Sequence, residues 1–228
     1  MAQQVPFSDT IDVEVRTSDL VDNPEPRVPL VLVLDKSGSM AGEPIRQLNE
    51  GLVAFKQATD KDELARKRVD VTIVQFGPVE VTGDFVTVNQ FTPPTLKAGG
   101  DTPLGAAILK AIELIDQRKQ VYRTNGLAYY RPWIFLVTDG APTDAWAAAR
   151  ERIREGEEAK KFIFLAVGVE GADFSVLNQL LHKREPVKLR GYAFEAMFQW
   201  LSASMSTISA SQVDEKVQLP PIGWSVVD

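Results

Sequence analysis

Three side chains that carry oxygen atoms follow an apolar run at alternate positions early in this 228-residue chain. The run covers residues 28–34, and Asp35, Ser37 and Ser39 come directly after it. One carboxylate and two hydroxyls are hard donors, which suit Mg²⁺ or Mn²⁺ better than a soft metal. Gly38 is expected to let the backbone turn both hydroxyls toward one point. The segment therefore predicts a divalent-cation site at the carboxyl end of a buried strand, where open α/β sheets bind ligands.

Two later segments end in oxygen donors at matching positions. Thr102 lies between a Gly-Gly pair at residues 99–100 and a helical pattern that begins at about residue 104. Asp139 follows a short apolar run at residues 133–138. Taken alone, Thr102 would be explained as a helix cap and Asp139 as part of an Asp-Gly turn. Together with the first segment, they form three loops in the order expected for one shared site.

Apolar strands alternate with amphipathic helices along the chain, which predicts an α/β fold with a doubly wound, mostly parallel central sheet. Residues 69–88, with turns at residues 77–78 and 83–84, predict an antiparallel hairpin at one edge. The other strands are expected at residues 28–34, 69–76, 133–138 and 162–169, and the helices around residues 45–55, 104–115, 144–158 and 194–208.

The chain divides by composition into three parts. Residues 1–27 form an N-terminal extension whose alternating segment at residues 11–15 predicts an edge strand. Residues 28–211 form the main domain, and residues 212–228 form a tail that contains Trp224. We expect this apolar tail to pack back on the domain, with a docking segment as the alternative.

Composition excludes several function classes. The net charge of −6 and the pI near 5.0 argue against general nucleic-acid binding. Lys183, Arg184, Lys188 and Arg190 leave a local basic patch as an alternative to an ordinary solvated surface. The absence of cysteine excludes thiol catalysis, disulfides and thiolate metal sites. The start of the chain has no leader-like pattern, and no apolar stretch approaches the roughly 20 residues that span a bilayer, so we expect a cytoplasmic protein without membrane contact.

The three loops resemble the von Willebrand factor A domain, whose metal-ion-dependent adhesion site (MIDAS) combines Asp-x-Ser-x-Ser, a later Thr and a later Asp. The matching residues are Asp35, Ser37, Ser39, Thr102 and Asp139. The resemblance implies a Rossmann-like fold for residues 28–211 and a Mg²⁺ or Mn²⁺ ion held by these residues directly or through water. Asp101 departs from the family pattern, which has a small residue there, and is expected to be a helix cap or a further carboxylate behind the site.

The same segments resemble most the TerY-like group, which is found in bacterial tellurite-resistance and stress gene clusters. Residues 34–45, 102–105 and 138–144 carry this resemblance. It implies that the neighbouring genes encode a protein kinase and a PP2C-type phosphatase, which are then candidate partners.

Charge counting favours binding over catalysis at this site. Asp35 and Asp139 supply all of its anionic charge, and if Asp139 acts through water, only about −1 is bonded directly to a +2 ion. Such an ion stays electrophilic and favours an Asp or Glu from a partner protein. A phosphatase of the haloacid-dehalogenase type would carry a second carboxylate at the position of Ser37. The single histidine, His182, is expected at a helix end on the surface, and no P-loop occurs.

The leading hypothesis is a non-enzymatic, Mg²⁺-dependent protein-interaction module that acts as a scaffold or adaptor in a bacterial tellurite-resistance, stress or phage-defence pathway. One alternative is a von Willebrand-type subunit of an AAA+ ATPase complex of the chelatase kind. A metal-dependent phosphatase is the less favoured alternative.

Overall fold

A seven-stranded sheet with helices on both faces forms the centre of the molecule. The computed structural model describes residues 23–226, so the expected edge strand at residues 11–15 lies outside the described part. The strands are β1 (Val28–Asp35), β2 (Val69–Phe76), β3 (Glu80–Val81), β4 (Val86–Thr87), β5 (Trp133–Thr138), β6 (Ile163–Gly168) and β7 (Val187–Lys188).

The described residues also contain one 3-10 helix and six α-helices. They are the 3-10 helix η1 (Gly38–Met40), α2 (Glu43–Asp60), α3 (Ala65–Arg68), α4 (Leu104–Thr124), α5 (Ala147–Glu158), α6 (Phe174–Leu180) and α7 (Phe194–Ala210). A long loop at residues 88–103 precedes α4. Between residues 23 and 226, none of these helices is long and apolar enough to cross a membrane.

The strand order is β3-β2-β1-β5-β6-β7, and β4 also pairs with β2. The pairings among β1, β2, β5, β6 and β7 are parallel, whereas β3 and β4 run antiparallel to β2. This confirms the predicted α/β architecture with an antiparallel edge. The edge consists of two separate two-residue strands, because β3 pairs near Val74 and β4 near Val71. The short strand β7 was not predicted, since two residues give no pattern to recognise.

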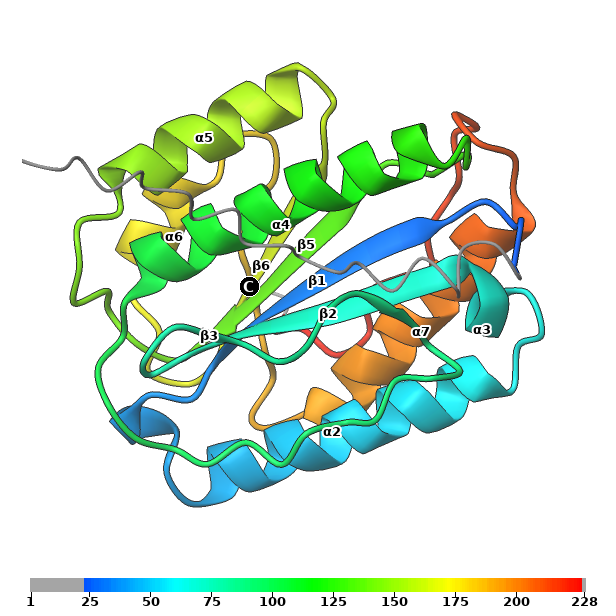
Figure 1. Cartoon of the computed structure of the whole chain (residues 1–228). Coiled ribbons are helices and arrows are strands. Elements are labelled where there is room, and N and C mark those ends of the chain that lie inside the picture. Colours follow the sequence, from blue (N-terminus) through cyan, green and yellow to red (C-terminus); the bar gives the residue numbers. More distant parts are fainter. Residues whose placement is uncertain (1–22, 227–228) are drawn as a thin grey trace, which may run out of the picture.

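Helices cover the sheet in two layers, with α2, α3 and α7 on one face and α4, α5 and α6 on the other (Figure 1). Alternate residues of β1 divide between the two cores. Leu30, Leu32 and Leu34 pack in the core with α2 and α7, while Val31 and Val33 pack in the core with α4. Because both faces of β1 are buried, its sequence is a continuous apolar run and not an alternating one.

The helix α2 begins after Gly42 and has a proline in its first turn, where the missing N–H costs nothing. Its apolar face packs on α7 at very close range. A Cβ atom on Gly51 would lie 2.5 Å from the ring of Phe198, whose centroid is 6.1 Å from that of the Phe55 ring, with the rings tilted by 57°. This contact packs the last helix, α7, against α2, which follows the first of the three loops.

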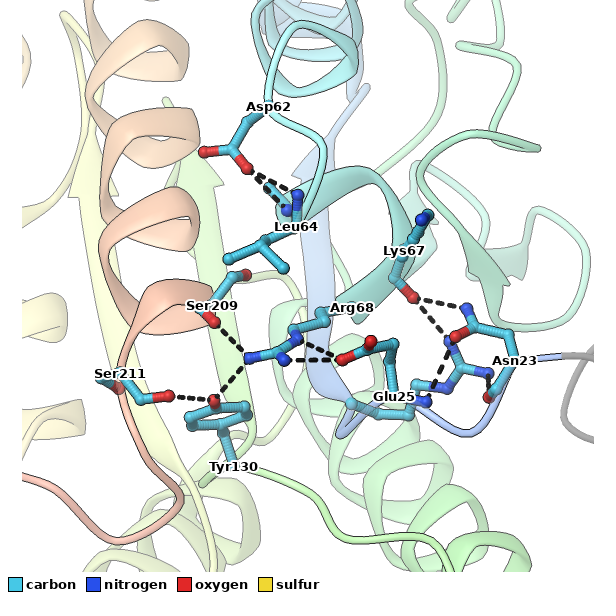
Figure 2. A network of polar contacts seen from close by, with 11 residues as sticks. Asn23, Glu25, Asp62, Leu64, Lys67, Arg68, Tyr130, Ser209 and Ser211 are labelled. Atoms are coloured by element: carbon cyan, nitrogen blue, oxygen red, sulfur yellow. Dashed lines mark hydrogen bonds and ion pairs between the residues drawn. The ribbon is translucent and has the colours of Figure 1, made fainter.

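A polar network ties the first described residues to the end of α7 (Figure 2). The Nη2 atom of Arg68 donates to Glu25 Oε2 at 2.6 Å, and its Nη1 atom donates to the carbonyl oxygen of Ser209 at 2.6 Å. The hydroxyl of Tyr130 donates to the carbonyl oxygen of Ser211 at 2.6 Å. The last carbonyls of a helix lack partners within the helix, so this network caps α7.

The tail packs on the domain around a buried tryptophan. Trp224 lies 5.7 Å from the ring of Trp200, whose Nε1 donates to the carbonyl oxygen of Pro220 at 2.8 Å. The tail also adds an antiparallel bridge between Ser225 and Leu189, next to β7. The described part of the tail, up to residue 226, therefore contributes to the core beside α7.

We expect Arg68→Ala to lower the free energy of unfolding by about 2 kcal/mol, because the change removes the charged donor from both Glu25 and the Ser209 carbonyl. Arg66→Ala is the matched control, since Arg66 lies exposed on the same short helix and its loss should change stability by less than about 0.5 kcal/mol. Denaturant unfolding of both variants measures this difference. Equal losses would show that the network does not stabilise the fold.

Candidate functional site

The site lies where β1 and β5 end side by side. Leu34 of β1 pairs with Val137 of β5, so the residues that follow the two strands emerge at the same edge of the sheet. Three loops meet there: residues 35–42 after β1, residues 99–103 before α4, and residues 139–146 after β5. The structure thus brings the sequence-predicted segments together.

Asp35 is fully buried at the end of β1 and is held on both oxygens. Its Oδ1 accepts a hydrogen bond from the amide of Ser37 at 2.8 Å, and its Oδ2 accepts one from the hydroxyl of Thr138 at 2.5 Å. The two serine hydroxyls lie together, with 3.0 Å between Ser37 Oγ and Ser39 Oγ. The two hydroxyls converge as expected, but the turn does not require glycine, because Gly38 lacks a positive φ and a Cβ atom on it would meet only the Gly100 carbonyl at 3.6 Å.

Asp139 closes the link between the first and third loops. Its Oδ1 accepts a hydrogen bond from the hydroxyl of Ser39 at 2.8 Å. A continuous chain of oxygen atoms therefore runs from Asp139 through Ser39 to Ser37. Asp139 is 7% exposed and Ser39 is the exposed member, so the group is open to solvent on the side of Ser39.

Thr102 reaches the same place from the second loop. Its hydroxyl lies close to the third loop, since a Cβ atom on Gly140 would be 3.2 Å from Thr102 Oγ1. Two hydrogen bonds also join these loops: the amide of Thr143 donates to the Thr102 carbonyl at 2.9 Å, and the Thr102 amide donates to the side-chain hydroxyl of Thr143 at 3.1 Å. Thr102 thus faces Gly140, one residue from Asp139.

Thr102 does not cap α4, which is the role that it would have if taken alone. The free amides of Gly105 and Ala106 donate instead to Asp144, at 3.0 Å to Oδ1 and 2.8 Å to Oδ2. Asp101 is exposed, and Asp144 occupies the capping position that Asp101 was expected to fill. The carboxylate of Asp144 is also favourable beside the positive end of the helix dipole.

Close backbone packing fixes the second loop against the first. The amide of Gly38 donates to the Gly100 carbonyl at 3.0 Å, and the amide of Gly99 donates to the Lys36 carbonyl at 2.7 Å. Gly100 has a φ of 83°, and a Cβ atom on it would lie 2.6 Å from the carbonyl oxygen of Gly77. Only glycine fits here, because both the conformation and the space exclude a side chain.

The electrostatics of the site favour a bound cation. Burial raises the pKa of Asp35 above its ordinary value, although its hydrogen bonds oppose this. Burial also raises the pKa of Asp139, and the neighbouring charge of Asp35 adds to the effect. In the part of the chain that the structure describes, neither carboxylate has a Lys or Arg within ion-pair distance. Two unpaired carboxylates beside three hydroxyls could hold Mg²⁺ or Mn²⁺.

Sequence reasoning assigns no individual role to the residues that support this group. Thr138 donates to Asp35, Thr143 bonds to Thr102, and Asp144 accepts from the first amides of α4. The only local signal for them was that they lie within five residues of Asp139. No cluster of three or more His, Cys, Asp or Glu residues with metal-binding geometry occurs within residues 23–226, so any metal site here depends on hydroxyls.

His182 lies away from this site and is exposed, as expected. Its Nε2 is 3.4 Å from Glu158 Oε1 at the end of α5. The helix α5 leads from the carboxyl end of β5 to the amino end of β6. Its last residue therefore lies at the amino ends of the parallel strands, opposite the three loops (Figure 1). His182 therefore cannot act as a base at the three loops.

The von Willebrand factor type A domain model matches residues 30–197 of the chain. Two curated relatives align over 117 residues: inter-alpha-trypsin inhibitor heavy chain H4 of Homo sapiens, at 31% identity, and inter alpha-trypsin inhibitor, heavy chain 4 of Mus musculus, at 30%. Each alignment covers 50% of this chain and 12% of the relative, so the chain matches only a small part of these longer proteins.

Solved structures with similar folds include the pilus adhesin SpaC of Lactobacillus rhamnosus GG in its open conformation. It has a TM-score of 0.65 and 14% identity, over 82% of this chain and 31% of the adhesin. Proximal thread matrix protein 1 of the mussel byssus, with a zinc-occupied MIDAS motif, has a TM-score of 0.55 and 16% identity, over 81% of this chain and 49% of the mussel protein. At these identities the similarity establishes the fold alone.

We expect Gly100→Ala to weaken Mg²⁺ or Mn²⁺ binding about 10- to 100-fold, because a side chain at Gly100 displaces the loop that carries Thr102. Gly83→Ala is the matched control: Gly83 has a φ of 73°, but a Cβ atom there would meet nothing within 4 Å. Both variants share the left-handed strain, and only Gly100→Ala also has the clash. Titration calorimetry with either metal compares them with the wild type, and equal affinities of all three proteins would contradict this role of Gly100.

The raised pKa values of Asp35 and Asp139 predict a pH dependence of the metal-free protein. The folded state binds these protons more tightly than the unfolded state, so their contribution to stability is present below the ordinary pKa of 3.8 and is lost as pH rises through the raised values. In EDTA, Asp139→Asn should therefore be more stable than the wild type at pH 7, and the difference should shrink toward pH 4. Thermal unfolding across this range measures it. A variant that is less stable than the wild type at pH 7 would contradict the prediction.

Proposed function

The chain belongs to the von Willebrand factor type A domain family, and we propose that it is a metal-dependent module that binds other proteins. One observation carries this proposal: hydrogen bonds join Ser37, Ser39 and Asp139 into one group of oxygen atoms, with Asp35 bonded beneath it and Thr102 facing it. A group of hydroxyls and carboxylates without a nearby histidine suits ligation better than proton transfer.

We assign Asp35, Ser37, Ser39, Thr102 and Asp139 as the residues that hold the metal, directly or through water. A divalent cation at this point would supply an electrophilic centre for a carboxylate. Mg²⁺ or Mn²⁺ is the proposed ion, because zinc prefers nitrogen and sulfur donors whereas all five side chains here offer oxygen. The coordination positions that the protein leaves open would accept an Asp or Glu of the partner.

The proposal assigns no catalytic residue. Ser37 stands where a phosphatase of the haloacid-dehalogenase type would have its second carboxylate, and its hydroxyl is bonded to Ser39. His182 lies at the other edge of the sheet. The raised pKa values of Asp35 and Asp139 have burial as their main cause, and a bound cation would reverse that effect.

We further propose that the chain is a cytoplasmic adaptor of the TerY-like group, which acts in a bacterial tellurite-resistance, stress or phage-defence pathway with a protein kinase and a PP2C-type phosphatase as partners. The support is the resemblance of residues 34–45, 102–105 and 138–144. Asp144, within the last of these segments, also positions α4. The proposal keeps residues 28–211 as the interaction domain, with 1–27 as an extension and 212–228 as a packed tail.

Partner capture by Asp139→Asn tests the proposal directly. Asn at this position still accepts the hydrogen bond of Ser39 but removes the charge, so we expect metal-dependent capture to fall at least tenfold while the fold remains intact. Asp101→Asn is the control, because it removes an exposed carboxylate next to Thr102 that lies outside the hydrogen-bonded group. Asp35→Ala is less suitable, since it would leave the Ser37 amide and the Thr138 hydroxyl without their acceptor.

The measurement is pull-down of the co-expressed kinase and phosphatase in Mg²⁺ and in EDTA. Equal capture in both buffers would rule out a metal bridge. Capture of an AAA+ ATPase in their place would favour the chelatase-like alternative, and metal-dependent phosphate release from generic phosphoesters would favour the enzymatic one.

A further inference from the structure

Five basic side chains surround the end of α5, at the amino ends of the parallel strands and opposite the three loops. This basic cluster consists of Arg131, Lys160, Lys161, Lys183 and Arg184. Its members come from three segments: the residue before Pro132 and β5, the turn after α5, and the loop before β7. A concentration of cations is notable in a chain whose net charge is −6.

Three of these residues donate hydrogen bonds to the carbonyl oxygen of Glu157. It accepts hydrogen bonds from Lys183 Nζ at 2.9 Å, from Arg131 Nη2 at 3.3 Å and from the backbone amide of Lys160 at 3.2 Å. Cations stabilise the last carbonyls of a helix, so capping accounts for Lys183 and Arg131. It does not account for the side chains of Lys160 and Lys161, which are exposed.

The side chain of Glu157 holds the fourth member of the cluster. Its buried Oε1 accepts hydrogen bonds from Arg184 Nη1 at 2.6 Å and from the amide of Phe164, in β6, at 3.2 Å. Arg184 is thereby fixed beside Arg131. Burial and the charge of Arg184 lower the pKa of Arg131, and the charge of Glu157 opposes this effect. Buried Glu157 thus holds the two guanidinium groups side by side at the surface.

Lys160 adopts a backbone conformation that favours glycine. Its φ is 55°, and among residues 23–226 only Asp214 shares a positive φ with it outside glycine. The amides of Lys160 and Lys161 bond to the carbonyls of Glu157 and Gly156, which is the pattern of a helix end that usually has glycine at this position. A lysine kept in a strained, exposed position is a reason to look for a function of its charge.

We propose that the basic cluster is a second docking surface, which binds an acidic segment of a protein partner without metal. The fixed guanidinium groups of Arg131 and Arg184 match carboxylates, and Lys160 and Lys161 extend the surface toward solvent. Exposed Glu158 and Glu185 lie close by in sequence and, like the overall negative charge, repel any anionic ligand. A short acidic segment that contacts only the cations incurs less of this repulsion than a long polyphosphate chain.

The three-loop site and the basic cluster lie at opposite ends of the parallel strands, so one chain could hold two partners at once. This inference does not depend on the proposed metal site. It identifies a function for the local basic patch around Lys183 and Arg184, which the sequence alone left open between a binding surface and an ordinary solvated one.

The test is the binding of a fluorescent ten-residue peptide of alternating Asp and Glu to the full chain in EDTA, followed by anisotropy at low and at physiological salt. We expect Lys160→Gly/Lys161→Gln to weaken binding about tenfold and salt to weaken wild-type binding. Lys61→Gln/Lys67→Gln is the control, because it removes the same charge from exposed positions elsewhere. Asp139→Asn should bind the peptide like the wild type, which separates this surface from the metal site.

Stability measurements separate a loss of peptide binding from a loss of folding. Lys160→Gly alone should raise the melting temperature by about 2 °C through relief of the strained backbone while it weakens peptide binding. Asp214→Gly relieves the same kind of strain elsewhere and should not weaken binding. Absence of peptide binding by the wild type, equal binding by the Lys160/Lys161 variant, or tighter binding of single-stranded DNA or of anionic vesicles than of the peptide would overturn the proposal.

Discussion

The buried carboxylates of Asp35 and Asp139 lie close together at the ends of neighbouring parallel strands, and hydroxyls hold them in place. Asp35 accepts hydrogen bonds from the hydroxyl of Thr138 and the amide of Ser37, while Asp139 accepts one from the hydroxyl of Ser39. Within the described residues, no cation pairs with either group. Burial that is not offset by an ion pair costs free energy, so this arrangement favours a cation. Contacts in the rest of the molecule keep these two carboxylates in position.

Backbone contacts supply that support. A Cβ atom on Gly100 would clash with the Gly77 carbonyl and one on Gly77 with the Gly99 carbonyl, so close backbone packing fixes the loop before Thr102. Asp144 bonds to the first amides of α4 from a different loop and so couples the position of Thr102 to that of Asp139. On the other face, α7 packs on α2 and is capped by Arg68 and Tyr130 (Figure 2). A rigid frame of this kind orients ligands before any metal or partner arrives.

The sequence was sufficient to predict the main architecture and the three loops that meet at the ends of β1 and β5, because these depend on local pattern. Continuous apolar runs identify buried parallel strands, and the Asp-x-Ser-x-Ser segment follows one of them. What failed depends on contacts between distant residues. Asp144 lies 39 residues from the amide of Gly105 that it caps, and its role became visible only in the folded chain. Gly38 was interpreted from its residue type alone, whereas the glycine that the loops require is Gly100. The short strand β7 forms because β6 offers a free edge, and no local pattern encodes it.

The central claim is that Asp35, Ser37, Ser39, Thr102 and Asp139 together hold one divalent ion whose open positions accept a partner's carboxylate. Crystals of the protein soaked in Mn²⁺ and measured for anomalous scattering would test this most directly. We predict one strong anomalous peak among these five side chains, with an Asp, Glu or water oxygen from outside the chain completing its coordination. A Mn²⁺-soaked crystal without a peak at this position, or with its strongest peak elsewhere on the molecule, would contradict the account.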